Sequence, residues 1–416
     1  MPKIAIIFPG QGSQYVGMGK QLYRQFSIVQ NTFKEANDIL GYDLKKLCFE
    51  GPFNELSKIE NIQPAILTAS VAAFKVFMNE IGLKPDLMTG HSFGELSALV
   101  CAEAISLETA LQITKIKAKA INETISHRPT AMAAVENVDL KLVEEICKSI
   151  SQKKRTVVIA AVNSSRQTVI SGDKALVRKA GALLANKGGK TEELFIGAAF
   201  HSPILNDAAK KVKTKIKKFR YSPLKYLVYS GITLRPYENT RDIIDNISWQ
   251  LCKPILWRSL VNILYKKGIR ATIEIGPRTM LIDFIKKINK QKKFFSFNKI
   301  NDLEFLKKEF CLNKEYKFDF IINCLRAAAC TKNNNLNEND HKMGVVEPYN
   351  EINKLLLALE EKNLEPSNDN LSAALKMFNT VLAAKKTPAK ETNDRYKELF
   401  YSRNGSYFPY LEKIIK

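Results

Sequence analysis

The feature that most constrains the fold is the alternation of short apolar runs with helix-like patterns over residues 1–125. The apolar run Ile4–Phe8 ends at Pro9-Gly10, which predicts a strand and a turn. The Ala-rich stretch Gln63–Phe77 and the stretch Glu95–Ala104 both fit helices. Alternating strands and helices favour a parallel sheet that is covered by helices. The sequence therefore predicts an α/β fold.

Residues 131–196 have a different rhythm, in which strands and helices follow in the order β-α-β-β-α-β. This order is that of the ferredoxin-like unit, so we expect a small subdomain inserted into the larger α/β domain. The predicted strands are 131–135, 157–162, 167–171 and 193–196, and the predicted helices are 140–150 and 175–186.

The main domain is expected to resume after this insert, with strands over 226–230 and 271–275 and a helix that contains Met280. A polar, Asn-rich stretch near 331–346 predicts a loop or linker, and two amphipathic helical patterns follow it. The expected domains are an α/β domain, a ferredoxin-like subdomain and a helical C-terminal extension, over 1–130 with 197–300, 131–196 and 301–416, respectively.

A candidate nucleophile lies in Gly90-His91-Ser92-Phe93-Gly94, which fits the pattern G-x-S-x-G. An apolar stretch precedes it and a helix-compatible run follows, as a nucleophile elbow between a strand and a helix requires. The glycines permit the tight turn, and the helix N-terminus stabilises developing negative charge. The pattern predicts Ser92 as a nucleophile; the alternative is a Gly-rich turn with an inert serine.

A serine nucleophile needs a base, and the chain has four histidines. His91 adjoins Ser92 and fits a packing or hydrogen-bonding role under the elbow. His127 and His341 lie in polar connections. His201 comes at the predicted end of a strand, where α/β sheets place catalytic side chains, so elimination favours it. A buried histidine without function is the alternative. Because no Asp or Glu is placed as a third member, a backbone carbonyl is a candidate to orient the imidazole.

The first turn, Gly10-Gln11-Gly12-Ser13-Gln14, directly follows the first strand. Its glycines let the backbone approach a ligand closely, and its N–H groups are suited to bind an oxyanion. A phosphate-binding loop is a competing interpretation, but the Lys of GxxxxGK[ST] is missing. A plain turn is the third.

Composition adds one anomaly, a net charge of +22. Such a charge fits nucleic acid, an anionic membrane or an acidic partner, or a compositional bias spread over the whole surface. No nucleic-acid-binding motif accompanies it, so nucleic acid is not favoured. No window approaches ~18 consecutive apolar residues, so no membrane helix is expected. Seven scattered cysteines without a CxxC pair predict neither a disulfide framework nor a zinc site, and favour the cytoplasm.

Six motifs occur along the chain in this order: GQGSQYVGMG, QPAILTASVAAF, GHSFGELSALVCA, AVNSSRQTVISG, AAFHSP and EIGPRTML, which start at residues 10, 63, 90, 161, 198 and 274. Together they resemble the malonyl-CoA:acyl-carrier-protein transacylases over about residues 1–300. The extra C-terminal helices make the chain more similar to the stand-alone, trans-acting enzymes of polyketide and lipopeptide synthase clusters.

The resemblance implies an α/β-hydrolase-like domain with the ferredoxin-like insert and a ping-pong transfer. Ser92 would accept the acyl group from malonyl-CoA or another acyl-CoA, and the phosphopantetheine thiol of an acyl carrier protein would then take it. His201 would act as base and acid, and the N–H groups of Gln11 and Phe93 would form the oxyanion hole. Gln250 would line the site and orient His201 through its carbonyl. The resemblance implies neither a cofactor nor a metal.

One position departs from the family pattern. The family places an arginine for the malonyl carboxylate in the helix after the elbow, and Lys117 stands at the matching position here. The neighbours of Lys117 at helical spacing are mostly apolar, which predicts that it points inward; a snorkelling surface lysine is the alternative. A lysine lacks the planar fork of arginine, which leaves malonyl selectivity open. Phe200 favours malonyl selectivity, because a bulky residue there would disfavour acyl groups with an α-methyl branch.

Two further functions stay open from the sequence: a hydrolase that clears stalled acyl chains from carrier proteins, and a non-catalytic carrier-protein binder. The Lys-rich stretch 210–220 follows His201 and fits a helix. Lys211, Lys215 and Lys218 are therefore expected either to dock an acidic carrier protein or to form a solvated surface.

Overall fold

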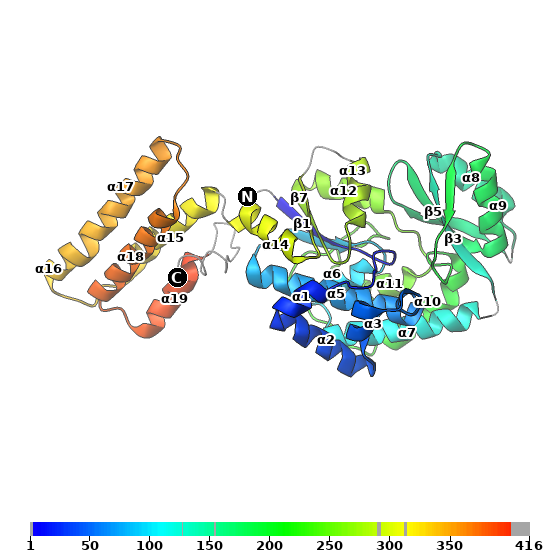
Figure 1. Cartoon of the computed structure of the whole chain (residues 1–416), viewed down its shortest axis with the longest axis horizontal. Coiled ribbons are helices and arrows are strands. Elements are labelled where there is room, and N and C mark those ends of the chain that lie inside the picture. The colour runs from blue at the N-terminus through cyan, green and yellow to red at the C-terminus, as the bar shows by residue number, and fades with distance from the viewer. Residues whose placement is uncertain (1–2, 127, 154, 289–292, 312–313, 401–416) are drawn as a thin grey trace. The chain divides into compact units, whose positions relative to one another are not determined.

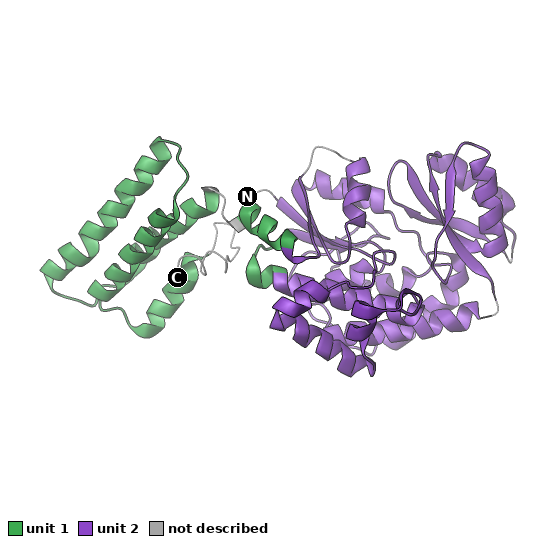
Figure 2. Cartoon of the chain, in the orientation of Figure 1, with its two compact units in different colours: residues 1, 77–84, 301–416 green, residues 2–76, 85–300 purple. Residues whose placement is uncertain are grey.

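The computed structural model describes the chain except for residues 1–2, 127, 154, 289–292, 312–313 and 401–416 (Figure 1). The described chain divides into two compact units (Figure 2). The α/β unit contains residues 2–76 and 85–300, and the helical unit contains residues 77–84 and 301–416.

A parallel four-stranded sheet forms the centre of the α/β unit, with the strand order β2-β1-β7-β8. These strands are Leu87–Gly90, Lys3–Phe8, Ile269–Ile275 and Lys293–Phe297, respectively. The apolar residues of β1 are all buried, as expected for a parallel strand covered on both faces. In the register of β1 and β2, Phe8 pairs with Gly90, so the turns that follow these strands lie side by side.

Helices surround this sheet (Figure 1). The long helix α5 (Ile59–Glu80) is the one described helix that is long and apolar enough to cross a membrane by length and composition. Because 83% of its apolar window is buried inside the protein, α5 is a core helix of the fold. The other helices of the α/β unit are α1 (Lys20–Gln25), α2 (Ser27–Leu40), α3 (Leu44–Glu50), α4 (Phe53–Leu56), α6 (Gly94–Cys101), α7 (Leu107–Ile125), α10 (Asn206–Ile216), α11 (Thr240–Trp249), α12 (Trp257–Lys266) and α13 (Met280–Ile288).

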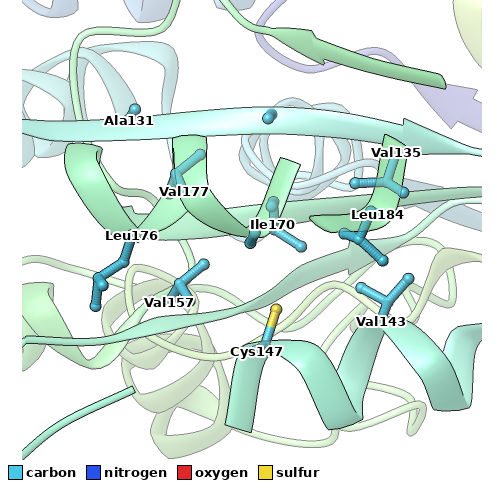
Figure 3. Close-up of a cluster of buried hydrophobic side chains, with 11 residues drawn as sticks. Ala131, Val135, Val143, Cys147, Val157, Ile170, Leu176, Val177 and Leu184 are labelled. Carbon is cyan, nitrogen blue, oxygen red and sulfur yellow. The ribbon is translucent and has the colours of Figure 1, made fainter. Parts of the chain in front are cut away.

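The inserted subdomain has an antiparallel sheet with the order β4-β5-β3-β6 and two helices, which is the ferredoxin-like arrangement. Its elements are β3 (Thr130–Glu136), α8 (Leu140–Ile150), β4 (Val157–Val162), β5 (Gln167–Asp173), α9 (Lys174–Ala185) and β6 (Lys190–Glu193). Figure 3 shows its separate core, in which Val143 and Cys147 of α8 and Val177 and Leu184 of α9 face Ile170 of the sheet.

The helical unit consists of α14 (Ile300–Leu306), α15 (Lys314–Cys330), α16 (Glu338–His341), α17 (Glu347–Glu361), α18 (Asn368–Ala384) and α19 (Ala389–Leu399). Helices α17, α18 and α19 pack against α15, where Phe320 and Phe400 lie 5.4 Å apart between ring centres. The buried Lys385 ammonium donates to the carbonyls of Ala328 and Thr331, at 2.9 and 2.7 Å. This lysine therefore caps the C-terminal carbonyls of α15.

Two predicted strands differ in the structure. Residues 226–230 form only single bridges, because Val228 pairs with Met88 while Tyr229 already turns back to Pro236. The strand predicted over 193–196 is β6 at Lys190–Glu193. It ends earlier because the Ile196 N–H donates to the Leu194 carbonyl in a tight turn.

The Asn-rich stretch is also more ordered than predicted, since residues 338–346 are helical. The side chain of Asn337 starts this helix by accepting from the N–H groups of Asn339 and Asp340. In the Lys-rich stretch, by contrast, α10 already ends at Ile216. Lys218 therefore lies beyond the helix that we expected to carry it.

Candidate active site

The elbow at Ser92 joins β2 to α6, and both flanking glycines are sterically required. A Cβ on Gly90 would lie 2.0 Å from the carbonyl carbon of Gly94, and a Cβ on Gly94 would lie 2.1 Å from the Phe8 oxygen. Ser92 itself has a φ of 51°, in the left-handed region that costs a non-glycine residue energy. Its hydroxyl is thereby presented at the end of the sheet, in front of the N-terminus of α6.

His201 faces this serine from the segment that follows β6, with its Nε2 2.7 Å from the Ser92 Oγ. Its Nδ1 lies 2.7 Å from the carbonyl oxygen of Gln250 and 3.2 Å from that of Lys253. Because carbonyl oxygens only accept, Nδ1 carries the proton and Nε2 offers its lone pair to the hydroxyl. Two backbone carbonyls thus hold the ring in the tautomer that a base requires.

The backbone of His201 is also held, since its φ is 59° and its N–H donates to the Leu251 carbonyl at 2.7 Å. Burial lowers the pKa of the imidazole to about 3. Nearby positive charge, to which Lys117 contributes, acts in the same direction. The ring is therefore neutral at physiological pH and able to accept a proton.

The first turn packs directly on the elbow, because a Cβ on Gly10 would lie 2.4 Å from the His91 carbonyl oxygen. Next to it, the Gln11 side-chain oxygen accepts from the Gln63 amide at 3.1 Å. Within the described chain, no hydrogen bond uses the backbone N–H of Gln11 or Phe93. Both donors are thus available to an acceptor other than the protein.

Lys117 lies on α7 with 3% of its surface exposed, whereas Lys115 and Lys119 are exposed. Its ammonium lies 5.7 Å from the centre of the Phe93 ring, next to the nucleophile in the chain. Burial lowers its pKa to about 8. Among the described residues, no hydrogen-bond acceptor is recorded for this ammonium and no carboxylate lies within ion-pair distance. A buried cation without such a partner is suited to an anionic ligand.

Glu95 is the acidic group that acts on Lys117, since the negative charge of Glu95 raises the pKa of the lysine. The Glu95 carboxylate is buried and already occupied: it accepts from the Gly231 N–H at 2.7 Å and from the Tyr237 hydroxyl. Burial raises the pKa of Glu95 to about 7. Glu95 therefore balances part of the lysine charge without bonding to the ammonium.

Comparisons with known proteins agree with this geometry. Residues 5–304 match the acyl transferase domain family. A malonyl CoA-acyl carrier protein transacylase of Bacillus subtilis is 30% identical over 396 residues, which are 94% of this chain and 98% of the relative. The chain belongs to this transacylase family. A second relative of that name, from Bacillus subtilis strain 168, is 35% identical over 70% of this chain and 92% of its own length.

Solved structures match the α/β part of this transacylase. A malonyl-transacylase in complex with its type II polyketide synthase acyl-carrier protein is 31% identical with a TM-score of 0.72, over 74% of this chain and 99% of that one. The malonyl CoA-acyl carrier protein transacylase of Clostridium perfringens is 32% identical with a TM-score of 0.69, over 74% of this chain and 96% of that one. The α/β fold is thus that of the family.

The structure brings most predicted site residues of the transacylase together. Ser92, His201 and the Gln250 carbonyl form one hydrogen-bonded series, and Lys117 lies over Phe93. Phe200 is buried, with its ring centre 6.4 Å from that of His201. The turn with Gln11 packs on the elbow. No group of three or more His, Cys, Asp or Glu side chains in the described part of the chain is placed to hold a metal ion.

The three lysines expected to dock a carrier protein are exposed. They differ in their partners: Lys211 pairs with Glu123 at 2.9 Å, whereas no ion pair is recorded for Lys215 or Lys218 among the described residues. Lys213 of the same helix is held between Asp245, at 2.6 Å, and the Trp249 ring. The charge of α10 is therefore partly compensated on the protein.

Sequence reasoning missed four polar groups of the site: the Lys253 carbonyl and the side chains of Glu95, Gln63 and Asn163. The last three lie inside the family motifs, in GHSFGEL, QPAIL and AVNSSRQ. Their place in these motifs was the one signal in the sequence that could have indicated a role in the site. Each acts through a contact distant in sequence, such as the Asn163 bond to His91, which no single motif reveals.

Proposed function

We propose that this transacylase moves a malonyl group from coenzyme A to the phosphopantetheine thiol of an acyl carrier protein through a malonyl-Ser92 intermediate. The observation that carries the proposal is the 2.7 Å contact between the Ser92 Oγ and the His201 Nε2, with His201 held by two carbonyls. A nucleophile, a base and a group that orients the base are the parts that acyl transfer through a serine requires.

In the first half-reaction, His201 Nε2 takes the hydroxyl proton while the Ser92 oxygen bonds to the thioester carbonyl carbon. The carbonyl oxygen becomes negative and accepts from the N–H groups of Gln11 and Phe93, which no group of the described protein uses. When the carbon–sulfur bond breaks, coenzyme A leaves with the proton from His201. Malonate then remains bound to Ser92 as an ester.

In the second half-reaction, the carrier-protein thiol gives its proton to the His201 Nε2, and its sulfur bonds to the ester carbonyl. The same N–H groups stabilise the negative oxygen. The bond to the Ser92 oxygen breaks, and this oxygen takes back the proton. The neutral imidazole is restored after each half-reaction, so one histidine serves as base and acid in both.

Lys117 is the group that we assign to the free carboxylate of malonate. It is buried and cationic, and it lies over the ring of the residue next to the nucleophile. A carboxylate would provide the hydrogen-bond acceptor that the ammonium lacks in the described protein, and a countercharge in direct contact with it. As a point charge, lysine binds one carboxylate oxygen well but does not impose the bidentate geometry of arginine.

A hydrolase is the second candidate, and the lysine at position 117 is the observation that favours it. If Lys117 binds the malonyl carboxylate more weakly than an arginine would, the site would also accept uncharged acyl groups. In a hydrolase, water would replace the thiol in the second half-reaction. The relatives described above favour the transferase: each is a malonyl transacylase, and one solved relative is bound to an acyl-carrier protein.

The proposal also covers the surface that docks the carrier protein, the subtype of the enzyme and its location in the cell. We assign the carrier dock to Lys211, Lys215 and Lys218, supported by their exposure and charge. The trans-acting subtype is supported by the Bacillus subtilis relative that is 30% identical. That relative aligns with 94% of this chain, whereas the solved relatives above align with 74%. Six described cysteines without a disulfide support a cytoplasmic location. That the enzyme needs no cofactor stays a prediction.

The test is the mass of the intact protein after brief incubation with malonyl-CoA. We expect a malonyl adduct on the wild type and none on Ser92→Ala, whose fold is checked by its thermal transition. Adding phosphopantetheinylated carrier protein should move the adduct to the carrier. An adduct on Ser92→Ala would contradict the nucleophile. Free malonate in place of malonyl-carrier would identify a hydrolase.

A further inference from the structure

A series of side-chain hydrogen bonds runs from the elbow into the ferredoxin-like subdomain. The His91 Nε2 lies 2.8 Å from the Asn163 Oδ1, at the start of the turn between β4 and β5. The Asn163 amide donates to the Gln167 Oε1 at 3.0 Å, and the Gln167 amide donates to the Glu136 carboxylate of β3 at 2.9 Å. Lys287 of α13 lies 3.7 Å from the same carboxylate. We call the four residues from His91 to Glu136 the relay.

The chemistry at the far end of the relay sets the direction of every bond in it. A carboxylate only accepts, so Gln167 must turn its NH₂ group to Glu136 and its oxygen to Asn163. Asn163 must then turn its NH₂ group to Gln167 and its oxygen to His91. An amide oxygen also only accepts, so the proton of His91 lies on Nε2. The relay thus selects one tautomer of His91, with the donor directed away from the elbow.

His91 is also fixed on its other sides. Its ring contacts Trp257 edge to face, at 5.5 Å between ring centres, and Phe284 at 6.2 Å. Its carbonyl oxygen accepts from the Gly94 N–H at 2.9 Å and lies against Gly10 of the first turn. A shift of His91 would therefore move both the nucleophile elbow and the turn that carries Gln11.

We propose that His91 is a positioning residue, which the relay holds in place and whose buried ring stays electrically neutral, so that the neighbouring His201 keeps its basicity. The proposal rests on the function assigned above to Ser92 and His201. It also gives the ferredoxin-like subdomain a task in the chemistry, since Asn163, Gln167 and Glu136 all belong to that subdomain.

The electrostatic reason concerns the charge that His201 gains when it takes the proton of Ser92. A positive His91 next to it would oppose that charge, and the His91 charge does act to lower the pKa of His201. Lys117 already contributes one positive charge there. The relay ends on two further charged groups, Glu136 and Lys287, which lie 3.7 Å apart. Burial lowers the pKa of His91, whereas its hydrogen bond to Asn163 acts in the opposite direction; burial is the larger effect and keeps the ring neutral.

The variant Asn163→Asp tests the charge, because it keeps the acceptor for His91 but makes it an anion that favours the imidazolium. The readout is the rate at which a fluorophosphonate labels Ser92 between pH 6 and pH 9. We expect a flat wild-type profile, since the pKa of His201 lies near 3. In Asn163→Asp the rate should fall about 10-fold toward pH 6, with a new ionisation in this range. Asn186→Asp, an exposed position at the end of α9, is the control and should follow the wild type.

Two neutral variants test the positioning. Asn163→Ala and Gln167→Met remove the first and the second bond of the relay without adding charge. We expect the kcat of malonyl transfer to fall about 10-fold and about 3-fold, respectively, while the KM for malonyl-CoA changes little. The variants are compared at temperatures below their thermal transitions, so that loss of folded protein does not enter.

Superimposable pH profiles for the wild type and Asn163→Asp would overturn the proposal, as would unchanged kcat in both neutral variants. Failure of the proposed function looks different: the fluorophosphonate would then label Ser92→Ala as well, or would not label the wild type. The two proposals are therefore tested separately by the same reagent.

Discussion

The two parts of the chain differ sharply in charge. Residues 1–300 contain 46 Lys and Arg against 25 Asp and Glu, whereas residues 301–416 contain 18 against 17. A compositional bias spread over the whole surface would have charged both parts. The positive charge instead accompanies the part that matches the acyl transferase family, at residues 5–304. We therefore expect this charge to attract anionic substrates and partners, because coenzyme A, malonate and phosphopantetheine are all negative.

The two parts also differ in their chemical equipment. The α/β unit contains the proposed nucleophile, the proposed base and a buried cation, held by contacts between residues distant in sequence. In the helical unit the buried Lys385 has a capping role, since its ammonium donates to the two carbonyls at the end of α15. We therefore expect a similar side chain to serve a ligand in one region, whereas it serves the fold in the other, depending on which acceptors the packing leaves free.

The strongest test of this contrast is a pair of histidine variants. His201→Ala should slow malonylation of Ser92 by roughly 10²–10⁴-fold, the usual contribution of a positioned general base. His341→Ala changes an exposed histidine of the helical unit and should leave the rate unchanged. Single-turnover acylation by malonyl-CoA measures both. Equal losses in the two variants would contradict a division of labour between the regions.

The next effect concerns the buried cation. Lys117→Ala should lower kcat/KM for malonyl-CoA by about 10–100-fold, because a charge-assisted hydrogen bond is lost, while acetyl transfer stays or rises. Lys119→Ala, at an exposed position on the same helix, is the control. Lys117→Arg should raise malonyl transfer, since the guanidinium fork restores two parallel bonds. If kcat/KM changed equally for malonyl-CoA and acetyl-CoA, Lys117 would not bind the malonyl carboxylate.

The same lysine predicts a pH dependence. With a pKa of about 8, Lys117 is charged below that pH and neutral above it. The kcat/KM for malonyl-CoA should therefore fall as the pH rises through about 8, whereas that for acetyl-CoA should not. Lys117→Arg should abolish the fall, because arginine stays protonated. A malonyl profile that is flat from pH 7 to pH 9 in the wild type would contradict the assignment.

The smallest expected effect separates the exposed lysines of the two regions. Replacing Lys211, Lys215 and Lys218 by glutamate should slow transfer to the carrier protein about 3–10-fold at low salt, and less at high salt. Acylation by malonyl-CoA should change much less. A matched triple change at exposed positions of the helical unit, Lys342, Lys354 and Lys362 to glutamate, should change neither half-reaction. If both triple variants slow transfer equally, net charge matters and position does not.

Much of the site could be predicted because close packing leaves short motifs little freedom. At Gly90 and Gly94 any Cβ would collide with backbone, so G-x-S-x-G predicts the elbow wherever a strand and a helix flank it. The inward direction of Lys117 follows from helical spacing, since positions three and four residues apart share a face. The order of elements in the ferredoxin-like subdomain follows from alternating apolar patterns in the same way.

The errors fall where a side chain or a tertiary contact starts or ends an element. Residues 226–230 have a strand-like composition, but they form a single bridge with β2, between Val228 and Met88. The Asn-rich stretch looks like a linker by composition, yet Asn337 caps a helix that continues through residue 346. Both outcomes depend on which groups are available to accept or donate a hydrogen bond, and composition does not specify that.

By itself the sequence determined the parallel sheet, the elbow, the candidate pair Ser92 and His201, and a lysine where the family has an arginine. These follow from local sterics and from side-chain periodicity, which act over a few residues. Only the tertiary structure decided that the carbonyls of Gln250 and Lys253 hold His201 and that Asn163 bonds to His91. These contacts join residues about 50 to 70 apart, and their geometry exists only after the sheet and the inserted subdomain have packed together.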